Sequence, residues 1–133
     1  MSMTIWGMLL AAMLSASITL SILFYRKQQR LSFGVFSLML CSVHLLTILI
    51  TNVIITVHPI HYDTLKNTAE SILLFSLIIP VIPLIGFILA IIELIKKNRN
   101  IPAAIAAMFL HYASVHFGIL YAFDLAISYI SSC

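Results

Sequence analysis

Four long apolar stretches, separated by three short connectors, constrain this chain more than any other feature of its sequence. The stretches lie near residues 3–25, 31–57, 69–95 and 101–130. Each is longer than the roughly 18 residues that indicate a membrane-spanning helix. The sequence therefore predicts an all-α, polytopic integral membrane protein. We expect one domain, residues 1–133, in which four transmembrane helices form a compact bundle.

The composition supports a membrane environment. The chain is 62% hydrophobic and only 8% charged, whereas soluble domains are about 45–50% apolar and about 25% charged. So few charges cannot cover the surface of a soluble domain of this size. The net charge of +3 does not indicate a nucleic-acid partner, because six of the seven basic residues lie in or beside two of the connectors.

The distribution of basic residues predicts the orientation. The first connector is flanked by Arg26, Lys27 and Arg30, and the third by Lys96, Lys97 and Arg99. The middle connector has only Lys66. Because basic loops stay in the cytoplasm, we expect the first and third connectors inside, both termini outside, and a location in the plasma membrane. The first stretch has no basic residues before it, so we expect a retained span and not a cleaved signal peptide.

Small residues and prolines give two of the stretches a local pattern. The first stretch has small side chains, several of them four residues apart: Gly7, Ala11, Ala12, Ser15, Ala16 and Thr19. Such spacing lets helices approach closely, and we expect internal packing, with a partner protein's helix as the alternative. In the third stretch, Pro80, Pro83 and Gly86 predict a kink. The alternative is a broken helix that lines a transport path.

Polar residues occur at matched depths in the second and fourth stretches, which run in the same direction. His44 lies at the centre of the second stretch, and His116 near the centre of the fourth. Asn52 and Asp124 follow eight residues later, ~12 Å closer to the outer face. We therefore predict that His44 meets His116 at mid-membrane, and that Asn52 meets Asp124 near the outer surface.

Helical periodicity distributes these residues over different faces. One side of the second stretch should face protein, because lipid offers no hydrogen-bond partners; it carries Ser37, Cys41, His44, Thr51 and Asn52. One face of the fourth stretch carries His111, Ser114, Gly118 and Ala122, and another carries Tyr112, His116, Ile119 and Phe123. Asp124 lies beyond these faces, near Tyr121 and Ser128.

These intramembrane polar residues are the candidate functional residues: His44, Asn52, His111, His116, Tyr121 and Asp124. We expect hydrogen bonds that fix helix packing. One alternative is a proton relay through His116, Tyr121 and Asp124. Another is haem held by two axial histidines, His44 and His116.

Motifs for catalysis or for firm metal binding are missing from the sequence. It has no phosphate-binding loop, nucleophile elbow, paired carboxylates or HExxH motif. The segment HPIHYD offers His58, His61 and Asp63, which is a weak metal pattern without a third firm ligand. Cys41 and Cys133 form neither a zinc nor a disulfide pattern. We expect no enzyme activity, no metal and no cofactor.

The leading hypothesis is a non-enzymatic membrane protein that acts through helix–helix contacts. It would be an accessory subunit of a membrane complex or an immunity-type protein. Its partners would be the lipid bilayer and a membrane protein or further copies of itself. The alternative is a transport or redox component that uses His44, His116 and Asp124, by a proton or ion path or by bis-histidine haem. A holin-like pore former is a third hypothesis.

Overall fold

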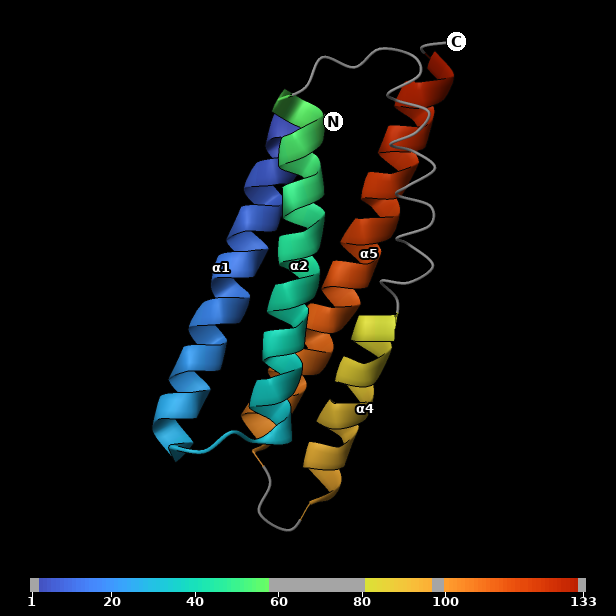
Figure 1. The fold of residues 1–133 in the computed structure, drawn as a ribbon. Coiled ribbons are helices and arrows are strands. Elements are labelled where there is room, and N and C mark those ends of the chain that lie inside the picture. Colours follow the sequence, from blue (N-terminus) through green and yellow to red (C-terminus); the bar gives the residue numbers. More distant parts are fainter. Residues whose placement is uncertain (1–2, 58–80, 97–99, 132–133) are drawn as a thin grey trace.

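The computed structural model describes residues 3–57, 81–96 and 100–131, and this part of the chain is helical, without strands. The described helices are α1 (Met3–Gln28), α2 (Phe33–Val57), α4 (Val81–Ile95) and α5 (Ile101–Ser131), and Figure 1 shows how they are arranged. The prediction of an all-α bundle is confirmed.

Three of the helices are long and apolar enough to cross a membrane. Helices α1, α2 and α5 have 26, 25 and 31 residues. At about 1.5 Å per residue each exceeds the ~30 Å of a hydrocarbon core. Helix α4 has 15 residues and is also apolar. Residues 58–80 lie outside the described part of the chain, and with them the HPIHYD segment, Pro80 and much of the predicted third span.

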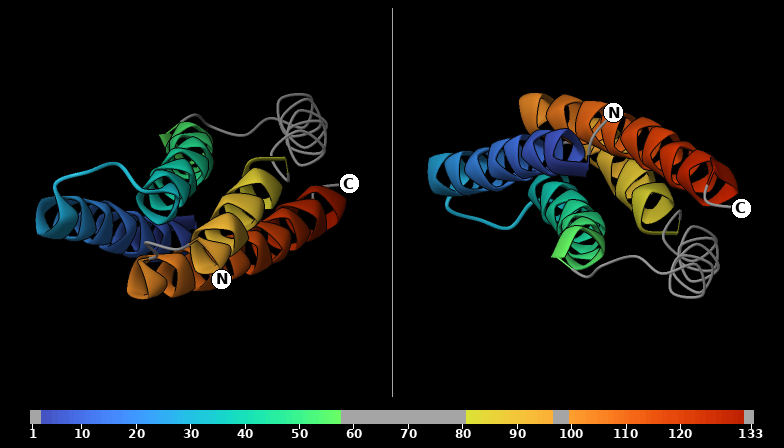
Figure 2. Two further views of the ribbon diagram at one scale, coloured as in Figure 1. Left: turned by 90° about the horizontal axis from the view of Figure 1, so that it is seen from below. Right: turned by 90° about the horizontal axis from the view of Figure 1, so that it is seen from above.

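Helix α2 contacts each of the other described helices. It packs against α1, α4 and α5, and α4 packs against α5 as well; Figure 2 shows this arrangement along the bundle axis. Helices α1 and α4 end where α2 and α5 begin, while the start of α1 and the end of α5 lie at the opposite end (Figure 1). Helices α2 and α5 are therefore parallel, as expected. Below, the two ends are called the basic end, which carries Arg26, Lys27 and Lys96, and the terminal end.

Local sequence sets the sharp turn between α1 and α2. Gln29 has a left-handed backbone (φ 52°), and its N–H donates to the Tyr25 carbonyl at 2.7 Å, which closes the last turn of α1. Ser32 then caps α2, because its hydroxyl accepts the Val35 N–H at 3.2 Å. These caps bring the two antiparallel helices together at the basic end.

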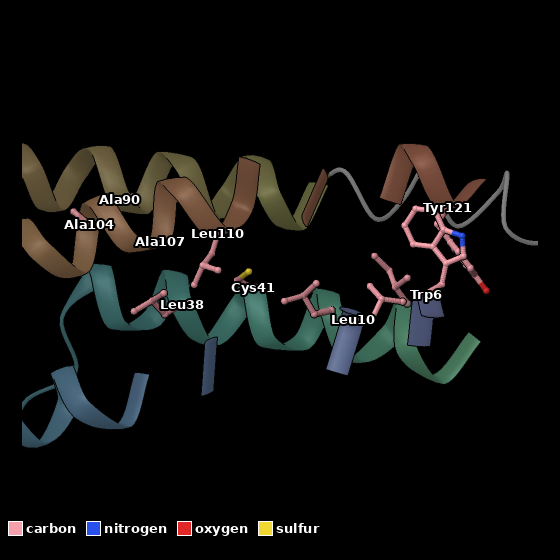
Figure 3. Packing of buried hydrophobic residues seen from close by; sticks show 11 residues of the cluster. Trp6, Leu10, Leu38, Cys41, Ala90, Ala104, Ala107, Leu110 and Tyr121 are labelled. Atoms are coloured by element: carbon pink, nitrogen blue, oxygen red, sulfur yellow. The ribbon is translucent and has the colours of Figure 1, made fainter. Parts of the chain in front are cut away.

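The interior contains small and polar residues as well as apolar ones. Figure 3 shows the packing of its apolar cluster, made of Trp6, Leu10, Leu38, Cys41, Leu45, Ile48, Ala90, Ala104, Ala107, Leu110 and Tyr121. Many larger apolar side chains point outward instead, among them Met8, Phe109 and Phe123, each about two-thirds exposed or more (67%, 70% and 65%). An apolar exterior around a core with small and polar residues is what lipid surroundings favour.

Helix α1 differs from the expectation. Its inward face carries Trp6, Leu10, Ser17 and Ser21. The residues Ala11, Ala12, Ser15, Ala16 and Thr19 are all exposed, so the prediction that they pack internally is wrong. Of the small residues, Gly7 does serve internal packing, because a side chain there would meet the Asn52 amide oxygen at 2.7 Å. Helix α1 is turned this way because Trp6 and Ser17 find hydrogen-bond partners in α5 and α2.

Candidate functional site

Polar residues that connect α5 to the other helices lie in three layers along the bundle axis. The basic-end layer comprises Glu93, Lys96 and Asn100; the middle layer comprises Ser37, Cys41, His44, Gly86, His111 and Ser114; and the terminal layer comprises Trp6, Asn52, Tyr121 and Asp124. Buried Ala90, Ala104 and Ala107 lie between the first two layers, and Leu45 and Ile48 between the last two. Ser17 and Ser42 connect α1 to α2 separately. The candidate residues other than His116 are therefore grouped in the middle and terminal layers.

His111 links α5 to α2 in the middle layer. Its imidazole is fully buried, and Nε2 lies 2.8 Å from the Ser37 carbonyl oxygen and 3.1 Å from the Ser37 hydroxyl. Because a carbonyl oxygen only accepts, Nε2 carries the hydrogen, and in the neutral ring the free lone pair is on Nδ1. Nδ1 is buried and has no hydrogen-bond partner within the described residues.

His44 joins the same two helices through Ser114. His44 Nδ1 lies 3.2 Å from the Ser114 hydroxyl, and that hydroxyl donates to the His111 carbonyl at 2.9 Å. A serine hydroxyl has a single hydrogen, so Ser114 accepts from His44, whose hydrogen is then on Nδ1. The Cys41 thiol lies beside the hydroxyls of Ser17 and Ser114. The hydrogen bond between helices that was expected of His44 agrees with these contacts.

Gly86 brings α4 into the middle layer. The Ser37 hydroxyl donates to the Gly86 carbonyl at 2.7 Å. A Cβ atom at Gly86 would overlap the His111 ring, so only glycine lets the α4 backbone lie against this imidazole. Ser37, Gly86 and His111 therefore form one contact point between α2, α4 and α5.

The terminal layer ties α1 and α2 to α5. The Trp6 indole N–H donates to an Asp124 carboxylate oxygen at 2.6 Å, and the Asn52 amide donates to the Tyr121 hydroxyl at 3.4 Å. The Trp6 ring also packs edge-on against Phe117 and Tyr121, with ring centroids 5.6 and 5.7 Å away. This layer combines a charge-assisted hydrogen bond with aromatic packing.

Loss of the Asp124 carboxylate should weaken this layer. We expect Asp124→Ala to lower the free energy of unfolding by about 1–3 kcal/mol, because the buried Trp6 N–H loses its acceptor. Asp124→Asn retains an oxygen acceptor and should lose less. Unfolding by sodium dodecyl sulfate in mixed micelles, followed by circular dichroism, measures the difference. In a Trp6→Phe background the effect of Asp124→Ala should shrink; an undiminished effect there would contradict the assigned hydrogen bond.

Glu93 forms the basic-end layer. Its carboxylate is fully buried, and Oε1 accepts the backbone N–H of Asn100 at 2.8 Å. Oε2 lies 4.0 Å from the Lys96 ammonium, which also stands 4.2 Å above the Phe33 ring. The Asn100 side chain in turn caps α5 by accepting the Ala103 N–H at 3.3 Å. Glu93 therefore holds the end of α4 against the start of α5.

Glu93 was not among the residues predicted from the sequence. A signal was present, because Glu93 is the one acidic residue of α4 and precedes Lys96 by three positions. That spacing is typical of an exposed ion pair on a helix surface. The burial of Glu93 depends instead on its contact with Asn100, the last residue of the connector.

The predicted pairing of His44 with His116 is wrong. His116 is exposed on the outer surface of α5, where its ring stacks on Tyr112 with centroids 6.3 Å apart and planes 8° apart. Ser114 takes the place beside His44, and residues two apart on a helix differ by about 200° in direction. His44 and His116 are thus not arranged as axial ligands of one haem.

The second predicted pair agrees with the structure in depth. Asn52 and Asp124 both belong to the terminal layer, where the Asn52 amide donates to Tyr121 and the Asp124 carboxylate accepts from Trp6. Of the proposed relay, Tyr121 and Asp124 lie in this layer and His116 lies outside it. Within the described residues, no three histidine, cysteine or acidic side chains are grouped for a metal ion.

Comparisons with known proteins found no relative of this chain. No protein family, no curated protein and no solved structure matches it.

Proposed function

We propose that this chain is a small, non-enzymatic integral membrane protein that acts by offering a helix face to another membrane protein. The partner would be a larger membrane complex, for which the chain is an accessory subunit, or a membrane-active toxin, against which it gives immunity. The observation that carries the proposal is the exposed face of α1.

This face consists of small side chains and is not used by the bundle. Ala11, Ser15 and Thr19 follow one another at intervals of four, with Ala12 and Ala16 beside them, and all five are exposed. The Ser15 hydroxyl donates to the Ala11 carbonyl of its own helix at 2.9 Å, so its hydrogen is already bonded when the side chain faces lipid. Small side chains at this spacing allow a second helix to approach closely, and van der Waals contact then stabilises the pair.

The interior layers support a packing role for the buried polar residues. Each layer ties two or three helices together, and apolar side chains separate one layer from the next. Among the described residues, the side chains buried between the layers include the apolar Ala90, Ala107 and Ile48. This layering favours a rigid scaffold over a transport component.

Larger side chains on the exposed face of α1 should weaken partner binding without unfolding the bundle. We expect Ala12→Leu and Ser15→Leu each to reduce the recovered partner about tenfold, equivalent to ~1.4 kcal/mol. The measurement is co-purification of a tagged chain at native expression after mild detergent extraction. Val43→Leu, at an exposed position of α2, is the matched control. Purification of the wild type without a partner, or retention of the partner by both variants, would count against the proposal.

A further inference from the structure

We propose that α5 pairs with the α5 helix of a second copy of this chain, through a seam of exposed residues on its outer face. The seam comprises Ile105, Phe109, Tyr112, His116, Ile119 and Phe123. The intervals between them alternate strictly between four and three, which is the heptad spacing of a coiled coil. All six side chains are exposed, although they include three aromatic rings and a histidine that a bundle interior would readily accommodate.

Two of the seam residues are polar and lie near the middle of the span. The candidate span in α5 is Ile101–Asp124, so Tyr112 is at its centre, and His116 is ~6 Å further along. Their rings stack on each other, but neither the phenol nor the imidazole has a hydrogen bond to any described residue. Ionisable residues inside a membrane almost always face protein or a water-filled cavity, because lipid cannot bond to them. This face is therefore expected to be covered by protein.

A second copy provides the required chemistry. Two copies inserted in the same orientation place their α5 helices parallel, and a two-fold axis along the membrane normal sets each seam residue opposite its own counterpart. Imidazole and phenol groups each donate and accept, so His116 can bond to His116 of the second copy, and Tyr112 to its counterpart. Each apolar seam residue packs against the same residue of the second copy.

Among the described residues, none covers the seam, so it is free for this contact. The opposite face of α5 is occupied by the bundle, with Ala104, Ala107, His111 and Ser114 all fully buried. The exposed face proposed for a partner is on another helix, α1. The inference therefore stands apart from the proposed function, and a test on the purified chain alone separates the two.

Disulfide cross-linking in lipid tests the pairing. Ile119→Cys is introduced into the full chain with Cys41→Ala and Cys133→Ser, reconstituted in excess lipid and oxidised mildly. The control is Ile50→Cys, which is also exposed and lies at the same depth, because Ile48 contacts Gly118 and Asn52 contacts Tyr121. We expect at least about tenfold more covalent dimer at position 119, since facing residues of a coiled coil meet the distance requirement for a disulfide.

The polar seam residues provide a second readout. His116→Leu and Tyr112→Phe should each weaken dimerisation in liposomes roughly threefold, and at most about twentyfold, as expected for one hydrogen bond between membrane helices. Energy transfer between labelled copies measures this, and circular dichroism checks the fold, which exposed positions should leave unchanged. Equal cross-linking at positions 119 and 50, no cross-linking at either, or a product in native membranes whose mass indicates another protein would overturn the inference.

Discussion

Replacing Gly86 by alanine is expected to destabilise the bundle by about 3 kcal/mol. The added methyl group would occupy the space of the His111 ring, and overpacking of a well-packed interior costs about 1–3 kcal/mol. Displacement of His111 would also remove its hydrogen bond to the Ser37 carbonyl, which adds about 1 kcal/mol. Unfolding in mixed micelles, followed by circular dichroism, measures the loss.

The other glycines supply matched controls for this prediction. A Cβ at Gly118 would meet the Ile48 methyl group at an ordinary 3.7 Å, whereas at Gly34 it would meet the Ala103 methyl group at 3.0 Å. We therefore expect Gly118→Ala to be tolerated, Gly34→Ala to be intermediate and Gly86→Ala to be worst. Combining Gly86→Ala with His111→Ala should cost less than the sum of the two single changes, because the overlap disappears. Equal stability of the Gly86 and Gly118 variants would contradict the packing described here.

The second large effect is expected at Glu93. Glu93→Leu keeps most of the side-chain volume but removes the acceptor for the buried Asn100 N–H. An unsatisfied buried donor costs about 1–3 kcal/mol, and we expect a loss of that size in the free energy of unfolding. The start of α5 should loosen first, and hydrogen exchange of the Ala103 and Ala104 amides measures this locally.

Glu93→Gln separates the hydrogen bond from the charge. Glutamine retains the carbonyl oxygen that accepts from Asn100, and it removes a carboxylate whose burial is itself unfavourable. Lys96 is partly exposed and remains solvated without its partner. We therefore expect the glutamine variant to stay within about 1 kcal/mol of the wild type. A glutamine variant as unstable as the leucine variant would mean that the charge, and not the hydrogen bond, holds α4 to α5.

The buried polar residues are explained best as contacts that hold the bundle in one arrangement. The middle layer fixes α2, α4 and α5 together, and the terminal layer fixes α1 to the same pair of helices. Hydrogen bonds between membrane helices are modest, averaging about 0.6 kcal/mol. These hydrogen bonds nevertheless require particular distances and angles, and they therefore determine which helix faces pack together. A scaffold held in this way can present α1 and α5 at defined positions to their partners.

Much of the α5 face assignment followed from sequence periodicity. The separation of His111 and Ser114 from Tyr112, His116, Ile119 and Phe123 was predicted correctly, because it depends only on the angle between residues of one helix. The depth of Asn52 and Asp124 was also predicted, since the rise per residue fixes it once the helix directions are known. The partner of His44 did not follow, because Ser114 and not His116 lies beside it. Two helices at the same depth can be rotated about their own axes, and periodicity within each one does not set that rotation.

The sequence by itself determined the helical class, the apolar spans and the shared end of the two basic connectors. These properties depend on the length of the apolar runs and on the positions of the basic residues. Neither depends on which face of a helix is turned toward its neighbours. The tertiary structure decided which face of α1 turns inward, that Ser114 and not His116 meets His44, and that Glu93 is buried against Asn100. Hydrogen bonds and steric fit depend on distance and angle between residues far apart in the chain, and only the packed bundle fixes those.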